Sequence, residues 1–502
     1  MNPSRVEFRP VDASRGVPVT AECLPARSPV RSDGGSPGGS ASRAWLLFAV
    51  ASLLVSGIFA LLLVIARVPP LSNWIGDPDF FRRCLVLHVN LSLLVWFTAF
   101  LACLYTRLPG PRRPVPQRVG LTTAVAGTVA MALSAFAPGS APILSNYIPF
   151  IQHPLFVAGL FSFLAGLALC VSGGPLLCNV LRGRGDREAL SLPPDAGVGV
   201  RVAACLFLVA LVTFLVSWAK TPASLPPEAY FELSVWGGGH VLQVVNVAAM
   251  VSVWLWLAGG LSGRDIVRPR TALLLFGLLA LPHLVSPFLA LGGTATPGYH
   301  AGFTRLMQFG LFPVVLIFIA ICGWRLIRDL GWRIPRLEGT LDYRLIGLGL
   351  SVLMTLVGFV LGAMIRGSNT MIPAHYHASI GAVTVAFMAA AFLMAERPVV
   401  SPLAARFRRW RPAALCCFGG GQLLFALGFA VGGAHGLGRK QYGSEQVMYS
   451  AGEYVGVVMM GLGGLIAVAG GVAFLGIIGI LLLGSRRRSR ACGEEFLYSK
   501  YQ

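Results

Sequence analysis

Twelve long apolar runs, separated by short polar segments, dominate this sequence. Each run holds about 20 residues or more, and a helix of that length crosses the ~30 Å hydrocarbon core of a bilayer. Because a backbone inside lipid must satisfy its own hydrogen bonds, such runs are predicted to be transmembrane helices. The fold class expected for 43–484 is therefore an all-α integral membrane bundle of twelve helices. The predicted spans are 44–66, 82–106, 118–137, 148–180, 198–219, 233–260, 270–293, 303–327, 343–365, 371–395, 411–433 and 449–484.

The composition excludes a soluble protein. Of the 502 residues, 55% are hydrophobic and only 12% are charged, and the mean hydropathy is +0.72, values that a soluble domain of this size does not have. The formal net charge of +20 would suggest a polyanionic partner in a soluble chain. Here the arginines lie in short segments between apolar runs, where they orient a membrane protein. We therefore predict membrane lipid around the chain and no nucleic-acid partner.

Lysine and arginine are unevenly divided between the two sides of the predicted bundle. Most of the 40 lie in the tails and beside the segments that follow the even-numbered spans. Because positively charged segments stay in the cytoplasm, both termini are predicted to be cytoplasmic, in a multi-pass protein of the cell (inner) membrane. The opposite side keeps Arg67, Arg82, Arg83, Lys220, Arg305, Arg366, Arg439 and Lys440.

The two ends of the chain differ from the predicted membrane domain. Residues 1–42 are rich in Pro, Gly, Ser and Arg and have no apolar run, which predicts a disordered cytoplasmic tail and not a signal peptide. Residues 485–502 are predicted to be a basic cytoplasmic tail. The ten cysteines form no CxxC or CxxCH motif, so neither a thiolate metal site nor a covalently attached c-type haem is predicted.

All eight histidines map to the predicted outer side of the membrane. Those inside spans lie within roughly the outer 15 Å, because a helix rises 1.5 Å per residue. Polar side chains inside spans are candidates for function, and neutral imidazole is the commonest ligand of haem iron and copper. The acidic residues avoid the cytoplasmic half of every predicted span, so no carboxylate-lined proton path from the cytoplasm is predicted.

The spacing of His375 and His377, in the run IPAHYHASIG, has a direct geometric consequence. Residues two apart on a helix point about 200° away from each other. These imidazoles cannot share one metal ion, but each can bind a metal on its own face of the helix. The alternative for this motif alone is a polar pair at the boundary between membrane and water.

Taken together, these features resemble the catalytic subunit I of the haem-copper oxidase superfamily, which includes cytochrome oxidases and nitric oxide reductases. The resemblance covers about 44–484 and is closest to the branch of cytochrome cbb oxidases and nitric oxide reductases. It rests on twelve spans with one histidine each on the second, sixth and seventh and a HxH motif on the tenth. It implies two haems and a second metal, copper or non-haem iron.

The resemblance assigns a role to each histidine inside a span. His88 and His377 would be the two axial ligands of a low-spin haem. His375 would be the proximal ligand of a high-spin haem, where the substrate binds. His240 and His283 would bind the second metal beside the high-spin iron, so the catalytic set would be His240, His283 and His375.

Two further assignments concern the outer segments. Arg439 and Lys440 resemble the basic pair that holds haem propionates through charge-assisted hydrogen bonds, and the alternative is a solvated loop. The family usually has a second histidine next to the one on span seven, but this chain has Leu284 there. A stable metal site needs a third ligand, and His300 is the candidate, with Gln243 the weaker one.

Neither subclass pattern of the superfamily is complete. Oxygen reductases use a tyrosine near the second metal from span six or seven, and this chain has none on either span. Nitric oxide reductases typically place a glutamate on span six, where Val244 stands here, and the nearest acid is Glu232.

The function implied is that of a respiratory-chain terminal oxidase, subunit I-like, which reduces O2 to water with electrons from an outer-side donor. The alternatives are a nitric oxide reductase-like subunit that converts NO to N2O, and a non-catalytic haem protein for electron transfer. A separate cytochrome, cupredoxin or quinol would deliver the electrons, and further oxidase subunits are expected as partners.

Overall fold

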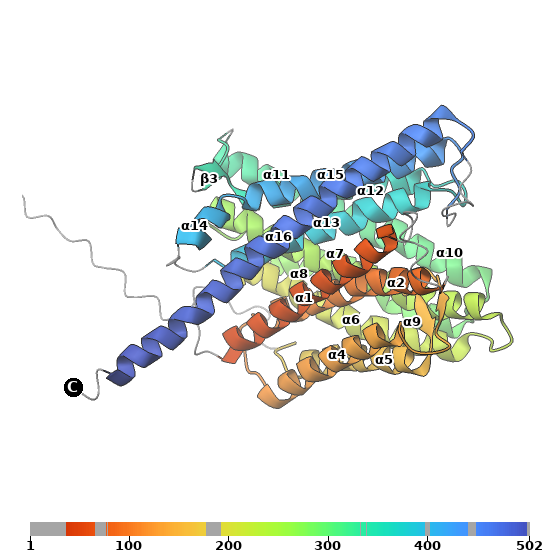
Figure 1. Ribbon diagram of the computed structural model, residues 1–502, viewed down its shortest axis with the longest axis horizontal. Helices are drawn as coiled ribbons and strands as arrows, with labels where there is room; N and C mark the ends of the chain where they lie inside the picture. Colours follow the sequence, from red (N-terminus) through yellow and green to blue (C-terminus); the bar gives the residue numbers. More distant parts are fainter. Residues whose placement is uncertain are drawn as a thin grey trace, which may run out of the picture.

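The computed structural model of this chain is a bundle of long helices that lie side by side (Figure 1). It describes residues 37–65, 77, 79–176, 192–331, 333–337, 339–396, 402–439 and 448–498. Most of the helices extend between the same two ends of the bundle. In chain order they are α1 (Pro37–Ile65), α2 (Phe80–Val89), η3 (Asn90–Val95), α3 (Trp96–Tyr105), α4 (Pro114–Ser134), α5 (Pro154–Ser172), α6 (Pro194–Lys220), α7 (Pro227–Ser262), α8 (Pro269–Ala280), η4 (Leu281–Val285), α9 (Ser286–Leu291), α10 (Pro297–Arg305), η5 (Leu306–Leu311), α11 (Phe312–Leu330), α12 (Tyr343–Ala363), α13 (Met371–Met394), α14 (Pro402–Arg408), α15 (Arg411–Ala434) and α16 (Ala451–Tyr498).

Within the described part of the chain, eleven helical segments are long and apolar enough to cross a membrane. The all-α membrane bundle expected from the sequence is confirmed, and the chain is a multi-pass membrane protein. The third expected span, 118–137, forms helix α4 but is not among the eleven. Its first turns carry Gln117 and Arg118, which lower its hydropathy.

The ends of the bundle differ in extent from the expected domain limits. Helix α1 begins at Pro37, inside the segment predicted to be a disordered tail, and α16 continues to Tyr498, past the expected end of the last span at residue 484. Residues 1–36 and 499–502 lie outside the described residues.

Three of the helical segments change their winding near the histidines. The helix that carries His88 passes into the π-helical η3, and the one that carries His300 passes into the π-helical η5. His283 lies in the 3-10 turn η4 between α8 and α9, where Pro282 cannot donate a backbone hydrogen bond. Irregular turns of this kind inside helices are frequent at functional sites.

Two antiparallel helix pairs approach each other closely through glycines spaced seven residues apart. In the pair α4 and α5, a Cβ at Gly127 would lie 2.5 Å from the backbone oxygen of Gly159. In the pair α15 and α16, a Cβ at Gly428 would lie 2.7 Å from the backbone oxygen of Gly456. Small residues at such contacts allow close packing of helices in a membrane.

Helix α13, which carries the HxH motif, lies in the middle of the bundle (Figure 1) and packs against α3, α7, α12, α15 and α16. Residues 382–392 in its second half are all buried, whereas 375–377 in its first half keep accessible surface. The helix is therefore fully packed at one end and only partly packed at the end with the histidines.

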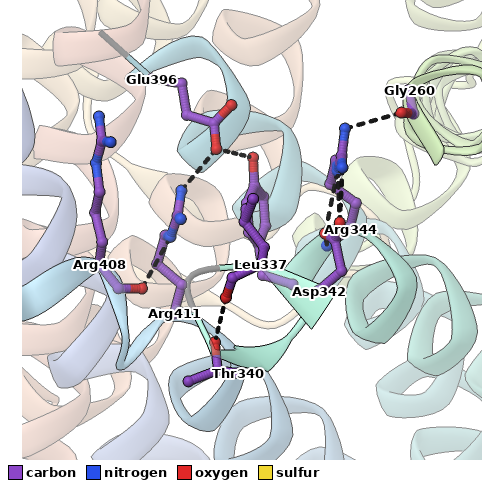
Figure 2. Close-up of polar contacts among 9 residues, drawn as sticks. Gly260, Leu337, Thr340, Asp342, Arg344, Glu396, Arg408 and Arg411 are labelled. Carbon is purple, nitrogen blue, oxygen red and sulfur yellow. Dashed lines mark hydrogen bonds and ion pairs between the residues drawn. The ribbon is translucent and has the colours of Figure 1, made fainter. Parts of the chain in front are cut away.

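The far end of α13 is held by a polar cluster that Figure 2 shows. Glu396 Oε1 accepts hydrogen bonds from the Tyr343 hydroxyl and from Arg411 Nη1, both at 2.9 Å. The Arg411 guanidinium lies over the Tyr343 ring, 4.2 Å from its centre, and Arg411 is only 2% exposed. This cluster joins the ends of α12, α13 and α15.

A short hairpin lies at the end of the bundle where α2, α7 and α13 begin, which we call the histidine end. Strand β1 (Ala141–Ile143) pairs antiparallel with β2 (Phe150–Gln152). Asn90 Nδ2 donates hydrogen bonds to the carbonyls of Val86 and Pro149, at 2.9 and 2.8 Å. The loop 144–149 is thereby fixed to the start of η3. The other hairpin, β3 (Arg336–Leu337) with β4 (Thr340–Leu341), lies at the opposite end.

Candidate functional site

The histidines that the sequence singled out lie at the histidine end of the bundle, on separate segments of the chain. His88 is on α2, His240 on α7, and the pair His375 and His377 on α13. His300 is on α10 and not in a loop, because Thr296 caps that helix and accepts from the Tyr299 amide at 3.3 Å.

The two histidines of the HxH motif contact different neighbours. His375 Nδ1 donates to the carbonyl of Gly358 on α12 at 2.7 Å, and a Cβ at Gly362 would lie 2.9 Å from the same nitrogen. His377 faces α15, where its ring stacks on Phe429, with centroids 5.3 Å apart, and meets the edge of Phe425 at 4.7 Å. The two imidazoles therefore lie against different helices, α12 and α15.

His88 approaches the His377 side of α13. Its Nδ1 lies 3.0 Å from the hydroxyl and 3.1 Å from the carbonyl of Ser56 on α1, which assigns the proton to Nδ1 and leaves Nε2 as the free donor atom. His88 and His377 are near enough for an electrostatic interaction, and Gln422 makes a hydrogen bond to His377.

His240 is buried on α7 with both ring nitrogens occupied. Its Nδ1 lies 2.8 Å from the carbonyl of Trp236, and its Nε2 lies 2.9 Å from the hydroxyl of Tyr147. Because a carbonyl can only accept, Nδ1 carries the proton and Nε2 accepts from Tyr147. His240 also interacts electrostatically with His300 and His283.

His283 is the buried histidine whose partner is missing. It is 1% exposed, and its Nε2 has no hydrogen-bond partner. Gly310 in η5 makes room for it, since a Cβ there would lie 3.2 Å from that nitrogen. An unpaired buried nitrogen is costly, and a metal ion would satisfy it.

His300 lies close to aromatic rings. Its ring centroid is 4.8 Å from that of Trp236 and 5.7 Å from that of Tyr299. Across the described ranges, no group of three or more His, Cys, Asp and Glu side chains is arranged to hold a metal ion. The structure thus places His240 and His300 against the same Trp236 ring, at centroid distances of 4.9 and 4.8 Å, without closing a set of ligands among the described residues.

Tyr147 is the residue that sequence reasoning missed. It lies in the loop between β1 and β2 with a φ of 65°, a conformation rare for a residue other than glycine. Its ring packs against Gly239, where a Cβ would lie 2.4 Å from the ring, and burial raises the pKa of its hydroxyl well above the usual value. The signal was the run Gly237, Gly238 and Gly239 before His240, because each glycine makes room for an aromatic side chain.

Polar contacts fix the Tyr147 loop on both sides. Glu232 on α7 accepts hydrogen bonds from the backbone amide of Asn146, at 2.7 Å, and from its side-chain amide. Arg439 Nη2 donates to Asn146 Oδ1 at 3.2 Å, and Tyr376 also bonds to Arg439. Arg439 therefore lies beside the HxH motif, while Lys440 lies outside the described residues.

The donor atoms fit the metal groups that the sequence implied. In each of His88, His240 and His375, Nδ1 is held by a carbonyl oxygen, and this second contact is typical of metal-binding imidazoles. The unpaired, buried Nε2 of His283 is also consistent with a metal ligand.

Comparisons with known proteins find relatives by sequence and a likeness by fold. No family model matches the chain. An uncharacterized protein of Aquifex aeolicus is 28% identical over 389 residues, covering 74% of this chain and 90% of that one, and an uncharacterized protein of Rickettsia prowazekii is 26% identical over 502 residues, covering 88% and 95%.

A solved structure described as a heme-copper terminal oxidase dimer superposes with a TM-score of 0.66, at 16% sequence identity, over 89% of this chain and 84% of that one. The class that this defines is an all-α membrane bundle with the fold of that terminal oxidase, as the sequence predicted. At this identity the likeness concerns the fold.

Proposed function

We propose that this chain is a haem-containing membrane oxidoreductase, a terminal oxidase of the subunit I type that reduces O2 to water. The observation that carries the proposal is the arrangement on α13, where His375 contacts α12, His377 contacts α15, and His377 is near enough to His88 for an electrostatic interaction. A single helix between two imidazole-ligated groups is what the oxidase resemblance requires. The likeness in fold supports the same conclusion.

The proposed ligand atoms are the ring nitrogens that no backbone carbonyl holds. His88 and His377 would hold the low-spin haem, and His375 the high-spin haem. His240 and His283 would hold the second metal, copper or non-haem iron. When bound, the high-spin haem and the second metal supply a place for a diatomic gas and electrons for its reduction.

The protein's own groups orient these ligands. The Gly358 carbonyl holds Nδ1 of His375, and the Trp236 carbonyl holds Nδ1 of His240. The ligand atom of each ring would be Nε2, which in His240 would have to exchange its hydrogen bond from Tyr147 for the metal. Arg439, with Lys440 beside it in the sequence, would hold haem propionates by charge-assisted hydrogen bonds. A third ligand for the second metal is proposed at His300.

Nitric oxide is the second candidate substrate, and one observation favours it. Leu284, at the position where the family usually has a further histidine, is 47% exposed on the side of the bundle and contributes nothing to the site. Tyr147 in turn favours oxygen reduction, since its hydroxyl lies 2.9 Å from His240 Nε2. A tyrosine from this loop would replace the one that oxygen reductases carry on span six or seven.

The proposed setting is the cell (inner) membrane, with both termini in the cytoplasm and the histidine end outside. Electrons would come from an outer cytochrome, cupredoxin or quinol, and further oxidase subunits would be partners. The described solved structure is itself a dimer.

The test is haem and metal analysis of the purified protein with a reduced-minus-oxidised spectrum, before and after carbon monoxide. We expect two haems per chain, of which one shifts with carbon monoxide, plus one copper or non-haem iron. His88→Ala should remove only the low-spin haem. A single haem whose spectrum does not change with carbon monoxide would support electron transfer as the only function, and absence of haem would refute the proposal.

A further inference from the structure

One exposed face of α11 combines an indole ring with two arginines, near the end of the bundle opposite the histidine end (Figure 1). Trp324 is 57% exposed, although it belongs to a segment that is long and apolar enough to span a membrane. The segment ends at Leu330, about 9 Å further along the helix axis at 1.5 Å per residue. Tryptophan at this depth lies at the level of the lipid headgroups.

Two guanidinium groups lie over the Trp324 ring. The Cζ atoms of Arg325 and Arg328 are 5.2 and 4.8 Å from the ring centre, within the range of a cation–π contact. This contact holds the two long side chains near each other and leaves N–H groups free to donate. Because part of their freedom is already lost, binding an anion costs them less entropy.

Positive charge is in excess at this end of α11. Asp329, whose side chain is largely buried, accepts from Arg264 Nε at 3.0 Å and also from Arg264 Nη2, so these two residues neutralise each other. Arg328 reaches Asp329 only through its Nε, at 3.4 Å. Arg325 has no hydrogen bond or ion pair with any described residue. The charges of Arg325 and Arg328 therefore remain to be balanced from outside the chain.

We propose that Trp324, Arg325 and Arg328 bind the phosphate of an anionic phospholipid. Arginine forms paired, charge-assisted hydrogen bonds to phosphate oxygens, and basic groups on helices at the membrane surface suit anionic headgroups. Ile317, two turns before Trp324 on the same face of α11, is also exposed. An acyl chain would cover it, whereas a free phosphate ion would contact only the arginines.

This site is independent of the oxidase proposal, because it contains none of the proposed haem or metal ligands. The test is native mass spectrometry of the purified full-length protein, stripped of lipid in a neutral detergent and titrated with phosphatidylglycerol or with phosphatidylcholine. We expect phosphatidylglycerol to bind more tightly. Phosphatidylcholine has the same phosphate but also a cation, which the excess positive charge repels.

Two variants divide the site into charge and ring. Arg325→Gln combined with Arg328→Gln should weaken phosphatidylglycerol binding by about 25-fold, since each basic residue at an anionic surface contributes about fivefold. Trp324→Leu keeps both charges and should weaken binding by about 2–5-fold, the contribution of an exposed cation–π contact.

The matched control combines Arg113→Gln with Arg118→Gln. These exposed arginines lie at the start of α4, at the same end of the bundle, and in the described part of the chain neither guanidinium lies over an aromatic ring. The control makes the same change in net charge and should bind phosphatidylglycerol as the wild type does.

Three results would overturn the proposal. Equal loss of binding in the control and in the Arg325 and Arg328 variant would mean a general attraction to positive charge. Equal affinity for the two lipids would remove the argument from charge. Displacement of phosphatidylglycerol by inorganic phosphate, compared with sodium chloride at equal ionic strength, would assign the site to a free anion. We expect no displacement, because the ion cannot replace the contacts of the acyl chain.

Discussion

Substituting Gly239 by alanine should release Tyr147 from His240. The added Cβ would lie 2.4 Å from the nearest atom of the Tyr147 ring and 2.6 Å from its Cβ, whereas ordinary contacts between carbons are about 3.5–4.0 Å. The ring must therefore move by about 1 Å. A shift of that size lengthens the 2.9 Å contact with His240 beyond hydrogen-bond range.

The expected cost is the sum of two unfavourable contributions and one favourable contribution. Overpacking costs about 1–3 kcal/mol, and the lost hydrogen bond about 0.5–1.5 kcal/mol. Alanine gains about 0.5–1 kcal/mol over glycine inside a helix. A glycine-to-alanine change that causes no clash has the same favourable contribution, so this contribution cancels when the two variants are compared. Relative to such a change, Gly239→Ala should destabilise the protein by about 1.5–4.5 kcal/mol.

The harmless change is Gly277→Ala on α8, where an added Cβ meets nothing within 4 Å. Unfolding of both variants by a denaturing detergent, followed by circular dichroism, measures the difference. Equal stability of the two variants would refute the packing argument for Tyr147.

Two other substitutions test the supports of the site and of the bundle. Ser56→Ala removes one of the two contacts to His88 Nδ1. It should weaken retention of the low-spin haem by about 10-fold, the lower end of the effect of losing a contact behind a metal ligand, because the backbone carbonyl remains. Unchanged haem retention would contradict this. Arg411→Ala leaves Glu396 and Tyr343 without the cation that they share. It should lower the free energy of unfolding in detergent by about 2–3 kcal/mol. This is less than the loss of a partner in a fully buried ion pair, since the Glu396 side chain is 34% exposed. A cost below about 0.5 kcal/mol would mean that the cluster does not hold these helix ends.

Hydropathy was sufficient to predict the helices, because a membrane leaves the backbone few alternatives to helix. The limit of hydropathy is visible in α4, which forms a helix although its polar first turns leave it less apolar than the eleven described segments that could span a membrane. The 3-10 turn at His283 was not predicted, since an apolar run gives no sign of a local change in winding other than Pro282.

For the site, helical geometry predicted the opposite orientation of His375 and His377, because a spacing of two residues fixes the angle between them. Tyr147 could not be found in the same way. It meets His240 across 93 positions of sequence, from a loop with no periodic pattern. A contact between distant segments depends on how the whole bundle packs, and the three glycines before His240 were the one local trace of it.

The hydrogen bond between Asn146 and Arg439 joins residues 293 positions apart, and it bears on how the protein is assembled. Translation proceeds from the amino terminus, so α7 with His240 is complete long before Arg439 leaves the ribosome. Until then the loop beside His240 is held by Asn90 and Glu232 but not by Arg439, and the histidine end is open toward the missing helices. Haem and metal delivered during synthesis would meet this open intermediate, and arrival of the last two helices would then close the end over them.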